Sequence, residues 1–306
     1  MLYCIRKSTP SKCPLYQNVH SIKMSSVSKR PECIRVDAGC YNSSHLVELP
    51  ANFRDTVVIR RMGLLKPTNT LFYAYEPDIK DLEYYKVAYI NLDKHEIYGT
   101  VAGPTNVSNF GSFDFYQGKN KVYLSSPNGV FQFADNKTTF FSSRGEDVDY
   151  LVFIGNVLFV KRDDGKSDDG KSDDGKIVEK IGDQFITYED YRAVKQFTLT
   201  ENRKYIVYLN RTGLYLNKFK RDETVYLSKN SFFRGITKSL EDTIYVWWID
   251  SIYKVEINEQ KFHKSRLVKV AEISGLGAMV FDGSDNILFN NNKGLYKLTK
   301  TEATEC

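Results

Sequence analysis

Four segments of the chain share one pattern of apolar and polar residues. Each has a β-rich run, a polar turn, and a second run in which a small residue is followed by apolar and aromatic residues. This pattern is typical of a β-hairpin. The four predicted hairpins span residues 122–133, 206–216, 244–255 and 287–298.

The turns of three of these hairpins contain glycine, at Gly129, Gly213 and Gly294. A tight hairpin turn needs positive φ, and glycine adopts it without steric cost. The aromatic residues of the second runs then fall at one register, at positions 131, 215, 253 and 296. The agreement indicates an internal repeat.

Two weaker copies fill the gaps, residues 71–75 with 87–90 and residues 157–160 with 177–178. The first residues of the six hairpins are then 51, 35, 49, 38 and 43 positions apart, and a four-stranded propeller blade has about 40–50 residues. Apolar runs precede the hairpins (112–115, 150–154, 196–199, 235–237, 278–281), and β-rich runs follow several of them (137–141, 224–227, 266–270). The sequence therefore predicts an all-β fold, a six-bladed β-propeller over residues 33–300.

The last unit ends at Lys300 after only three strands, whereas residues 45–49 form a strand outside any unit. We expect this N-terminal strand to pair with the final blade and close the ring, since an open edge would otherwise be exposed. Residues 1–32 are predicted to be a disordered or non-native segment, and residues 301–306 a short tail. Residues 163–176 repeat Asp-Asp-Gly-Lys without an apolar residue, which predicts a disordered loop between the middle strands of the third blade, on the ligand face.

The amino-acid composition supports a strand-rich fold and excludes some kinds of binding partner. The 21 tyrosines and 19 phenylalanines favour pleated, half-buried surfaces. The net charge of +5 comes from 43 basic and 38 acidic residues that are spread along the chain, so nucleic acid is not an expected partner. No apolar run reaches the ~20 residues of a membrane span. We expect a monomer that binds neither nucleic acid nor a membrane.

Two signals about the cellular location disagree. Four sequons, at Asn42, Asn106, Asn136 and Asn210, favour a secreted glycoprotein. The first thirty residues contain no apolar stretch of ~7–15 residues that would indicate a signal peptide. We interpret them as not being the native start of a mature secreted protein; a cytosolic protein with unused sequons is the alternative.

The chain has five cysteines, none of them in a Cys-x-x-Cys pair, so zinc and redox motifs are not indicated. Cys33 and Cys40 bracket a short segment and are predicted to form a local disulfide. The pairing of Cys4, Cys13 and Cys306 stays open.

In a propeller, the junctions between blades surround a central pocket on one face. The junction residues are Arg60 or Arg61, Phe110 with Gly111, Asp149, Lys195 with Gln196, Arg234, and Leu276 with Gly277. They include one carboxylate, whereas hard cations need several oxygen ligands. The four histidines stand apart from any candidate nucleophile, and the chain has no Gly-x-Ser-x-Gly motif. We therefore expect no metal, no cofactor and no catalytic residue.

The predicted pocket lining is aromatic and cationic. The candidate ligand-binding residues are Arg60, Phe110, Phe113, Asp149, Tyr150, Arg211 and Arg234. Rings that stack and arginines that pair with carboxylates suit a planar, anionic aromatic ligand. The alternative is that the aromatic residues form the core between blades and the arginines are surface charges.

The chain resembles a known family in several segments: Cys33 to Tyr41, residues 69–73 (NTLFY), 85–93 (YKVAYINLD), 128–131 (NGVF), 234–237 (RGIT) and 244–246 (IYV). These look like the insect ommochrome-binding proteins, over roughly residues 33–300. The resemblance implies a secreted haemolymph carrier whose partner is a small-molecule pigment, a carboxylated aromatic compound. Two other functions stay open, a metal-dependent lactonase or esterase and a protein-interaction propeller.

Overall fold

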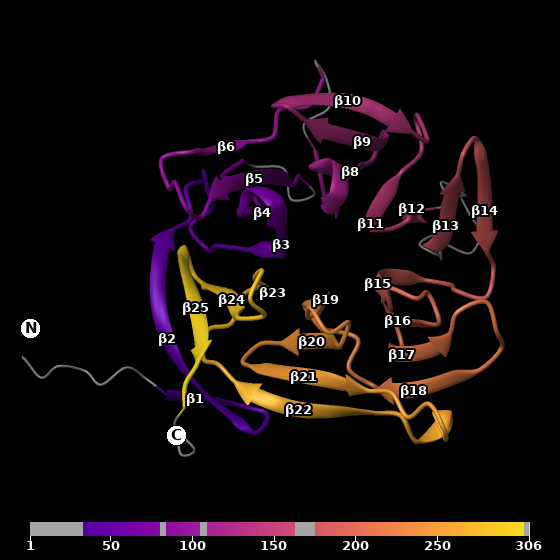
Figure 1. Cartoon of the computed structure of the whole chain (residues 1–306). Coiled ribbons are helices and arrows are strands. Elements are labelled where there is room, and N and C mark those ends of the chain that lie inside the picture. The colour runs from indigo at the N-terminus through magenta and orange to yellow at the C-terminus, as the bar shows by residue number, and fades with distance from the viewer. Residues whose placement is uncertain (1–32, 80–83, 105–108, 163–174, 303–305) are drawn as a thin grey trace, which may run out of the picture. The chain divides into compact units, whose positions relative to one another are not determined.

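The computed structural model describes residues 33–79, 84–104, 109–162, 175–302 and 306, which all belong to one compact unit. Nearly all of its regular structure is β-strand (Figure 1). Three single-turn 3-10 helices, η1 (Lys66–Thr68), η2 (Gln117–Lys119) and η3 (Phe262–Lys264), are the helical elements of this part of the chain. None of its helices is long and apolar enough to cross a membrane.

Four consecutive segments each fold into a four-stranded antiparallel sheet in which neighbouring strands follow each other along the chain. The first sheet contains β3 (Ile59–Leu65), β4 (Thr70–Tyr75), β5 (Lys86–Asn91) and β6 (Tyr98–Thr100). The second contains β7 (Ser112–Tyr116), β8 (Lys121–Ser126), β9 (Gly129–Ala134) and β10 (Lys137–Ser142). The third contains β11 (Val148–Ile154), β12 (Asn156–Lys161), β13 (Lys176–Ile181) and β14 (Gln184–Tyr188). The fourth contains β15 (Val194–Leu199), β16 (Tyr205–Asn210), β17 (Gly213–Lys218) and β18 (Thr224–Ser228).

The remaining strands form one nine-stranded sheet, in the order β19-β20-β21-β22-β1-β2-β25-β24-β23. Its strands are β19 (Gly235–Lys238), β20 (Ile244–Trp248), β21 (Ser251–Glu256), β22 (Arg266–Glu272), β23 (Met279–Phe281), β24 (Ile287–Asn291) and β25 (Gly294–Lys300), together with the N-terminal β1 (Cys33–Val36) and β2 (Gly39–Glu48). β1 pairs with β22 through Val36 and Ala271. We call this junction between β22 and β1 the seam.

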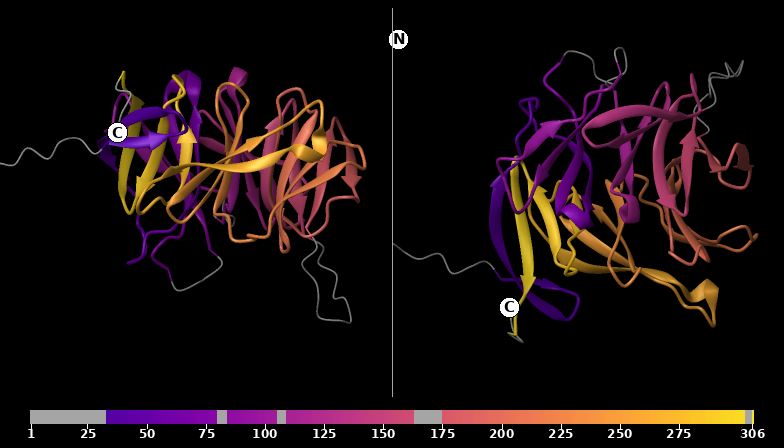
Figure 2. Two further views of the ribbon diagram at one scale, coloured as in Figure 1. Left: turned by 90° about the horizontal axis from the view of Figure 1, so that it is seen from below. Right: turned by 45° about the horizontal axis from the view of Figure 1, so that its top comes forward.

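The sheets stand side by side around a common centre (Figures 1 and 2). The first strand of each four-stranded sheet and the two end strands of the nine-stranded sheet, β19 and β23, contact one another in a closed circuit. The circuit runs from β3 to β7, β11, β15, β19, β23 and back to β3. This is a propeller-like arrangement, as the repeat predicted. All six predicted hairpins are present as the strand pairs β4–β5, β8–β9, β12–β13, β16–β17, β20–β21 and β24–β25.

The predicted closure by an N-terminal strand is confirmed. β2 pairs with β25 from Tyr41 opposite Lys300 to Glu48 opposite Gly294, so β2 is longer than the predicted strand 45–49. β1 was not predicted from the sequence; it forms a hairpin with β2.

The glycine turns are confirmed at two of the three predicted positions. Gly129 and Gly213 have φ of +117° and +147°. In the β24–β25 turn the positive φ belongs to Asn292, at +55°, and Gly294 begins the next strand. The prediction for Gly294 is therefore wrong: asparagine tolerates the left-handed region and takes the position instead.

Candidate functional site

A cavity of about 280 Å³ lies where the innermost strands begin. Arg60 lies on β3, Asp149 on β11 and Gln196 on β15, each close to the start of its strand, and Arg211 lies in the β16–β17 turn. This is the face that the sequence analysis assigned to the ligand. We call this cavity the junction pocket.

The junction pocket is predominantly cationic among the described residues. Its charged lining residues are Arg60, Asp149, Arg162, Lys195 and Arg211. Asp149 is the one carboxylate, and its Oδ2 atom lies 3.1 Å from Nη2 of Arg162. Among the described lining residues, four basic side chains outnumber the one carboxylate, and this favours an anionic ligand.

The guanidinium of Arg60 is held by an aromatic face. Its Cζ atom lies 4.2 Å from the centroid of the Tyr85 ring, a cation–π contact. A guanidinium stacked in this way keeps its N–H groups at the edge, where they can donate to a carboxylate.

The structure brings together three of the predicted site residues, Arg60, Asp149 and Arg211. Arg234 lies beside the pocket without lining it: its Nη1 donates to Leu276 O over 3.0 Å, and its carbonyl accepts a hydrogen bond from the pocket residue Gln196. Sequence reasoning missed Arg162, whose only signal was its position immediately before the insertion.

Phe110 and Phe113 do not line the pocket, and their prediction as ligand-binding residues is wrong. Both side chains are 0 % exposed. Phe110 packs edge-on against Phe131, and Phe113 packs against Phe72 on the neighbouring sheet. Both belong to the apolar core between the first two sheets, Phe113 from β7 and Phe110 from the segment just before it.

Tyr150 lines a different cavity, of about 160 Å³, farther along the innermost strands. Its ring lies under the guanidinium of Arg61, 4.5 Å from centroid to Cζ. Arg61 also donates to Ser112 Oγ and Leu151 O, each over 2.8 Å. These contacts join three sheets, so Arg61 and Tyr150 act as structural residues. Burial raises the pKa of the Tyr150 hydroxyl, which keeps it neutral.

Asp114 lies in the same cavity, with Oδ2 3.6 Å from Nη2 of Arg61. Burial raises the pKa of this carboxyl group, and the opposing influence of Arg61 and of the N–H groups of Phe153 and Phe115 is smaller. Asp114 is thus a carboxyl group of this second cavity that was not predicted as a site residue from the sequence.

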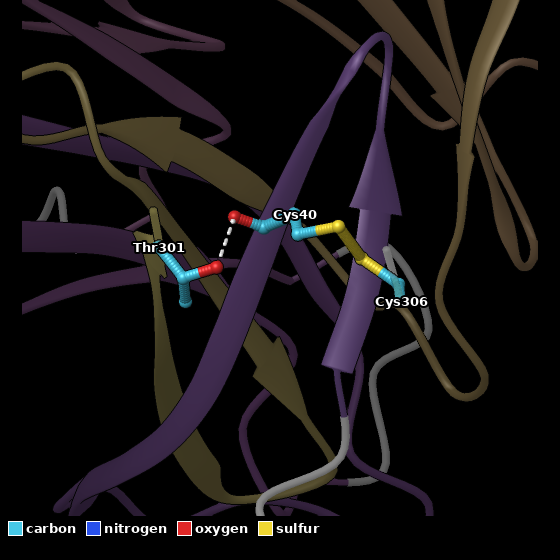
Figure 3. The surroundings of a disulfide bond; sticks show 3 residues. All are labelled: Cys40, Thr301 and Cys306. Atoms are coloured by element: carbon cyan, nitrogen blue, oxygen red, sulfur yellow. Dashed lines mark hydrogen bonds between the residues drawn. A yellow bond between two sulfur atoms is a disulfide. The ribbon is translucent and has the colours of Figure 1, made fainter. Parts of the chain in front are cut away.

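The structure pairs Cys40 with Cys306, so the predicted Cys33–Cys40 disulfide is wrong (Figure 3). In the β1–β2 hairpin Cys33 is opposite Asn42, and Cys40 is opposite Arg35. Cys33 and Cys40 are therefore diagonal neighbours, a spacing of ~7–8 Å that is long for a disulfide. Cys40 and Cys306 have a Cα–Cα distance of 5.8 Å, which is well suited to one.

Three of the four sequons fall on described residues. Asn42 lies exposed on β2, and Asn136 is exposed in the β9–β10 turn. Asn210 is the last residue of β16, and its Oδ1 accepts hydrogen bonds from Thr212 and Gly213 of the following turn. Asn106 is outside the described residues, and glycosylation stays a prediction.

The insertion interrupts the third sheet between β12 and β13, as expected. Arg162 and Gly175, which flank its undescribed part, line the junction pocket. Residues 163–174 of the predicted disordered loop lie outside the described residues, as do residues 1–32.

Within the described ranges, one group of cysteine, histidine or acidic side chains is close enough to share a metal ion. It consists of Cys33, Cys40 and Cys306, away from the junction pocket. The lining residues that the structure describes include a single carboxylate, which does not fit a hard divalent cation.

Comparisons with known proteins agree on the fold. No protein-family model matches the chain, and no curated protein matches it. Among solved structures, the chain is similar to a gluconolactonase from Xanthomonas campestris, with a TM-score of 0.62 and 8% identity over 88% of this chain and 95% of that one. It is also similar to the WD40 propeller domain of Doa1, with a TM-score of 0.52 and 9% identity over 86% and 99% of the two chains.

The WD40 repeats of RRP9 are a further similar structure, with a TM-score of 0.52 and 10% identity over 88% of this chain and 100% of that one. The chain has a β-propeller fold. At these identities the likeness concerns the fold alone.

Proposed function

We propose that this protein is a six-bladed β-propeller that binds a planar, acidic aromatic small molecule in the junction pocket and carries it chemically unchanged. The single observation that carries this proposal is the cationic character of the described pocket lining, whose one carboxylate is paired with Arg162. The resemblance of the sequence to insect ommochrome-binding proteins supports an ommochrome or similar pigment as the ligand. A secreted, glycosylated monomer belongs to the same proposal.

The blade count follows from dividing the nine-stranded sheet at β1. β19–β22 form a meander like those of the first four sheets, and β23–β25 with β2 supply four more strands. β1 then bridges two blades through its pairing with Ala271. Six innermost strands in a closed circuit agree with this division.

The size of the pocket supports a particular orientation of the ligand. About 280 Å³ is just below the ~300–1,000 Å³ of typical ligand pockets. We propose that the charged end of the ligand enters and that its rings extend toward the mouth. Phe232 lies between the lining residues Ser231 and Phe233 and is 74% exposed, so its ring is available for stacking.

Titration with a xanthommatin-type pigment tests this proposal. Trp247 is a suitable reporter, because it accepts a hydrogen bond at its carbonyl from Arg234, next to the pocket. We expect tryptophan quenching, a shift of the visible pigment spectrum, and recovery of unchanged pigment by mass spectrometry. No quenching and no shift would rule the carrier out.

Two variants and a matched control locate the site. Arg60→Ala and Arg211→Ala each remove one charged donor, and we expect each to weaken binding by about 10- to 100-fold, the effect of one charge-assisted hydrogen bond. Arg266→Ala is the control, since Arg266 pairs with Glu256 on the outer strands. Equal affinities for all three variants would place the ligand elsewhere.

A metal-dependent hydrolase is the second candidate, because such enzymes share the propeller fold. The described lining of the junction pocket does not favour a hydrolase of this kind, because it has one carboxylate and hard cations need several oxygen ligands. Stoichiometric calcium or zinc in the purified protein, together with turnover of a lactone or ester, would replace the carrier by this function.

A further inference from the structure

Three cysteines meet at the N-terminal hairpin. The Sγ atoms of Cys33, Cys40 and Cys306 all lie within 4.8 Å of one another. Cys40 and Cys306 are bonded, and Cys33 is the free, exposed thiol among the cysteines of the described residues. Cys33 and Cys40 share one face of the hairpin, because Cys33 is opposite Asn42, which is two residues beyond Cys40. A thiol therefore stands beside a disulfide.

We propose that Cys33 is an exchanging thiol that takes over the bond to Cys306. A thiolate attacks one sulfur of a disulfide, forms a new S–S bond with it, and expels the other sulfur as a thiolate. Cys306 is exposed, whereas Cys40 is 1% exposed, so Sγ of Cys306 is the accessible target. The product is a Cys33–Cys306 disulfide and a Cys40 thiolate. The proton that Cys33 loses to solvent is replaced by one that Cys40 gains, and no oxidant or reductant is needed.

Both bonds close the ring to a similar degree. The Cys40–Cys306 bond spans 266 residues, and a Cys33–Cys306 bond would span 273 (306 − 33). The entropic effect of a crosslink depends on the logarithm of this length, so the two isomers differ by only about 4% in this contribution to the folding equilibrium constant.

The exchange changes which thiol is accessible. In the Cys40–Cys306 isomer the exposed thiol of Cys33 can react with other disulfides. In the Cys33–Cys306 isomer the free thiol is that of Cys40, whose position is 1% exposed. Cys33 also lines a groove of about 740 Å³ along the seam, with Ile34, Phe289 and Tyr296. The second isomer therefore brings the chain terminus to this groove and withdraws the reactive thiol.

Disulfide mapping of the full chain tests the proposal. Cys4→Ser and Cys13→Ser are introduced together, so that these two thiols do not contribute. The protein is incubated at about pH 8, near the ordinary cysteine pKa, treated with N-ethylmaleimide, acidified, and digested with an acid protease. We expect two crosslinked species by mass spectrometry, Cys40–Cys306 with label on Cys33, and Cys33–Cys306 with Cys40 reduced. Cys40–Cys306 alone, with Cys33 fully labelled after prolonged incubation, would overturn the proposal.

Single variants provide the controls. In the same background, Cys33→Ser is expected to give Cys40–Cys306 only, and Cys40→Ser to form Cys33–Cys306 in a glutathione redox buffer. Free thiols at both positions of folded Cys40→Ser protein would contradict the exchange. Stoichiometric zinc held by the reduced protein would also overturn it, since the three sulfurs would then be a metal site.

Discussion

Glu179 on β13 shows how one residue joins two sheets. Its side chain is 0% exposed, and its Oε1 atom lies 2.7 Å from Nη1 of Arg203, on the neighbouring fourth unit. Asn156 donates to Oε1 over 2.9 Å, and the Tyr188 hydroxyl donates to Oε2 over 2.5 Å. Burial opposes ionisation of this carboxyl group, but these donors outweigh it and lower the pKa of Glu179 to about 2. A buried charge with several donors stabilises the fold only while it stays ionised.

We therefore predict that stability falls in acid because of this residue. An unfolded glutamate has a pKa near 4.5, so the stabilisation is complete above that pH and is lost as the pH falls toward 2. The difference of about 2.5 pKa units corresponds to about 3 kcal/mol. Glu179→Gln should lower the free energy of unfolding at pH 7 by about this amount and flatten its pH dependence between 5 and 2, measured by urea denaturation.

The exposed pair of Glu259 and Lys204 supplies the control. Glu259 is 62% exposed and lies 3.1 Å from Lys204, and surface pairs contribute about 0–1 kcal/mol. Glu259→Gln should leave the stability nearly unchanged. An equal loss in both variants would contradict a special role for Glu179.

The role of a single side chain is only partly predictable from the sequence. Arg60 and Arg61 are adjacent and chemically identical, yet Arg60 lines the junction pocket and Arg61 joins three sheets. Phe110 and Phe113 could equally have faced the ligand or the core. Neighbouring residues on a strand point to opposite sides, so the role of each depends on a register that tertiary packing decides.

At the scale of single elements, tight hairpin turns connect the middle strands of the second and fourth sheets. In the β16–β17 turn Gly213 has φ of +147°, and a Cβ atom there would lie 2.1 Å from Ser228 O. The approach of β18 to this turn thus excludes every side chain. This agrees with the sequence signal, in which glycine marked the turns.

We predict that Gly213→Ala destabilises the fourth sheet by about 1–3 kcal/mol, through positive φ and the contact with Ser228. Thermal denaturation measures the loss. Gly118→Ala is the matched control, because Gly118 is free of positive φ and its nearest contact, in the Tyr116 ring, would be an ordinary 3.5 Å. Equal melting temperatures of the two variants would show that the turn can relax.

The elements that the sequence identified are those with a repeated pattern. Hairpins recur six times, so weak copies are recognised by their spacing. β1 has four residues and no counterpart in another unit, and its pairing with β22 rests on one residue pair distant in sequence. A non-local strand pairing of this kind, which occurs once in the fold, leaves no periodic signal in the chain.

At the scale of the whole molecule, closure of the ring depends on β2, an N-terminal strand that pairs with β25, the most C-terminal strand. Hydrogen bonds along β2 and β25 provide this closure. Thr301 continues it, because its N–H donates to Cys40 O over 2.8 Å and its hydroxyl donates to the same oxygen over 3.3 Å (Figure 3). The Cys40–Cys306 disulfide adds a covalent link across the same junction. The strand pairing was predictable because the last unit lacked a fourth strand, whereas the disulfide depends on where the chain end lies.

We predict that Cys306→Ser lowers the free energy of unfolding by about 5 kcal/mol, because a crosslink of this span removes much conformational entropy from the unfolded chain. For a unit of this size that corresponds to a melting temperature about 8 °C lower. Dithiothreitol should lower the melting temperature of the unmodified protein to the same value and leave Cys306→Ser unchanged. Cys33→Ser should melt like the unmodified protein, because Cys40–Cys306 remains. A melting temperature of Cys306→Ser equal to that of the oxidised protein would show that the β2–β25 pairing closes the ring without the disulfide.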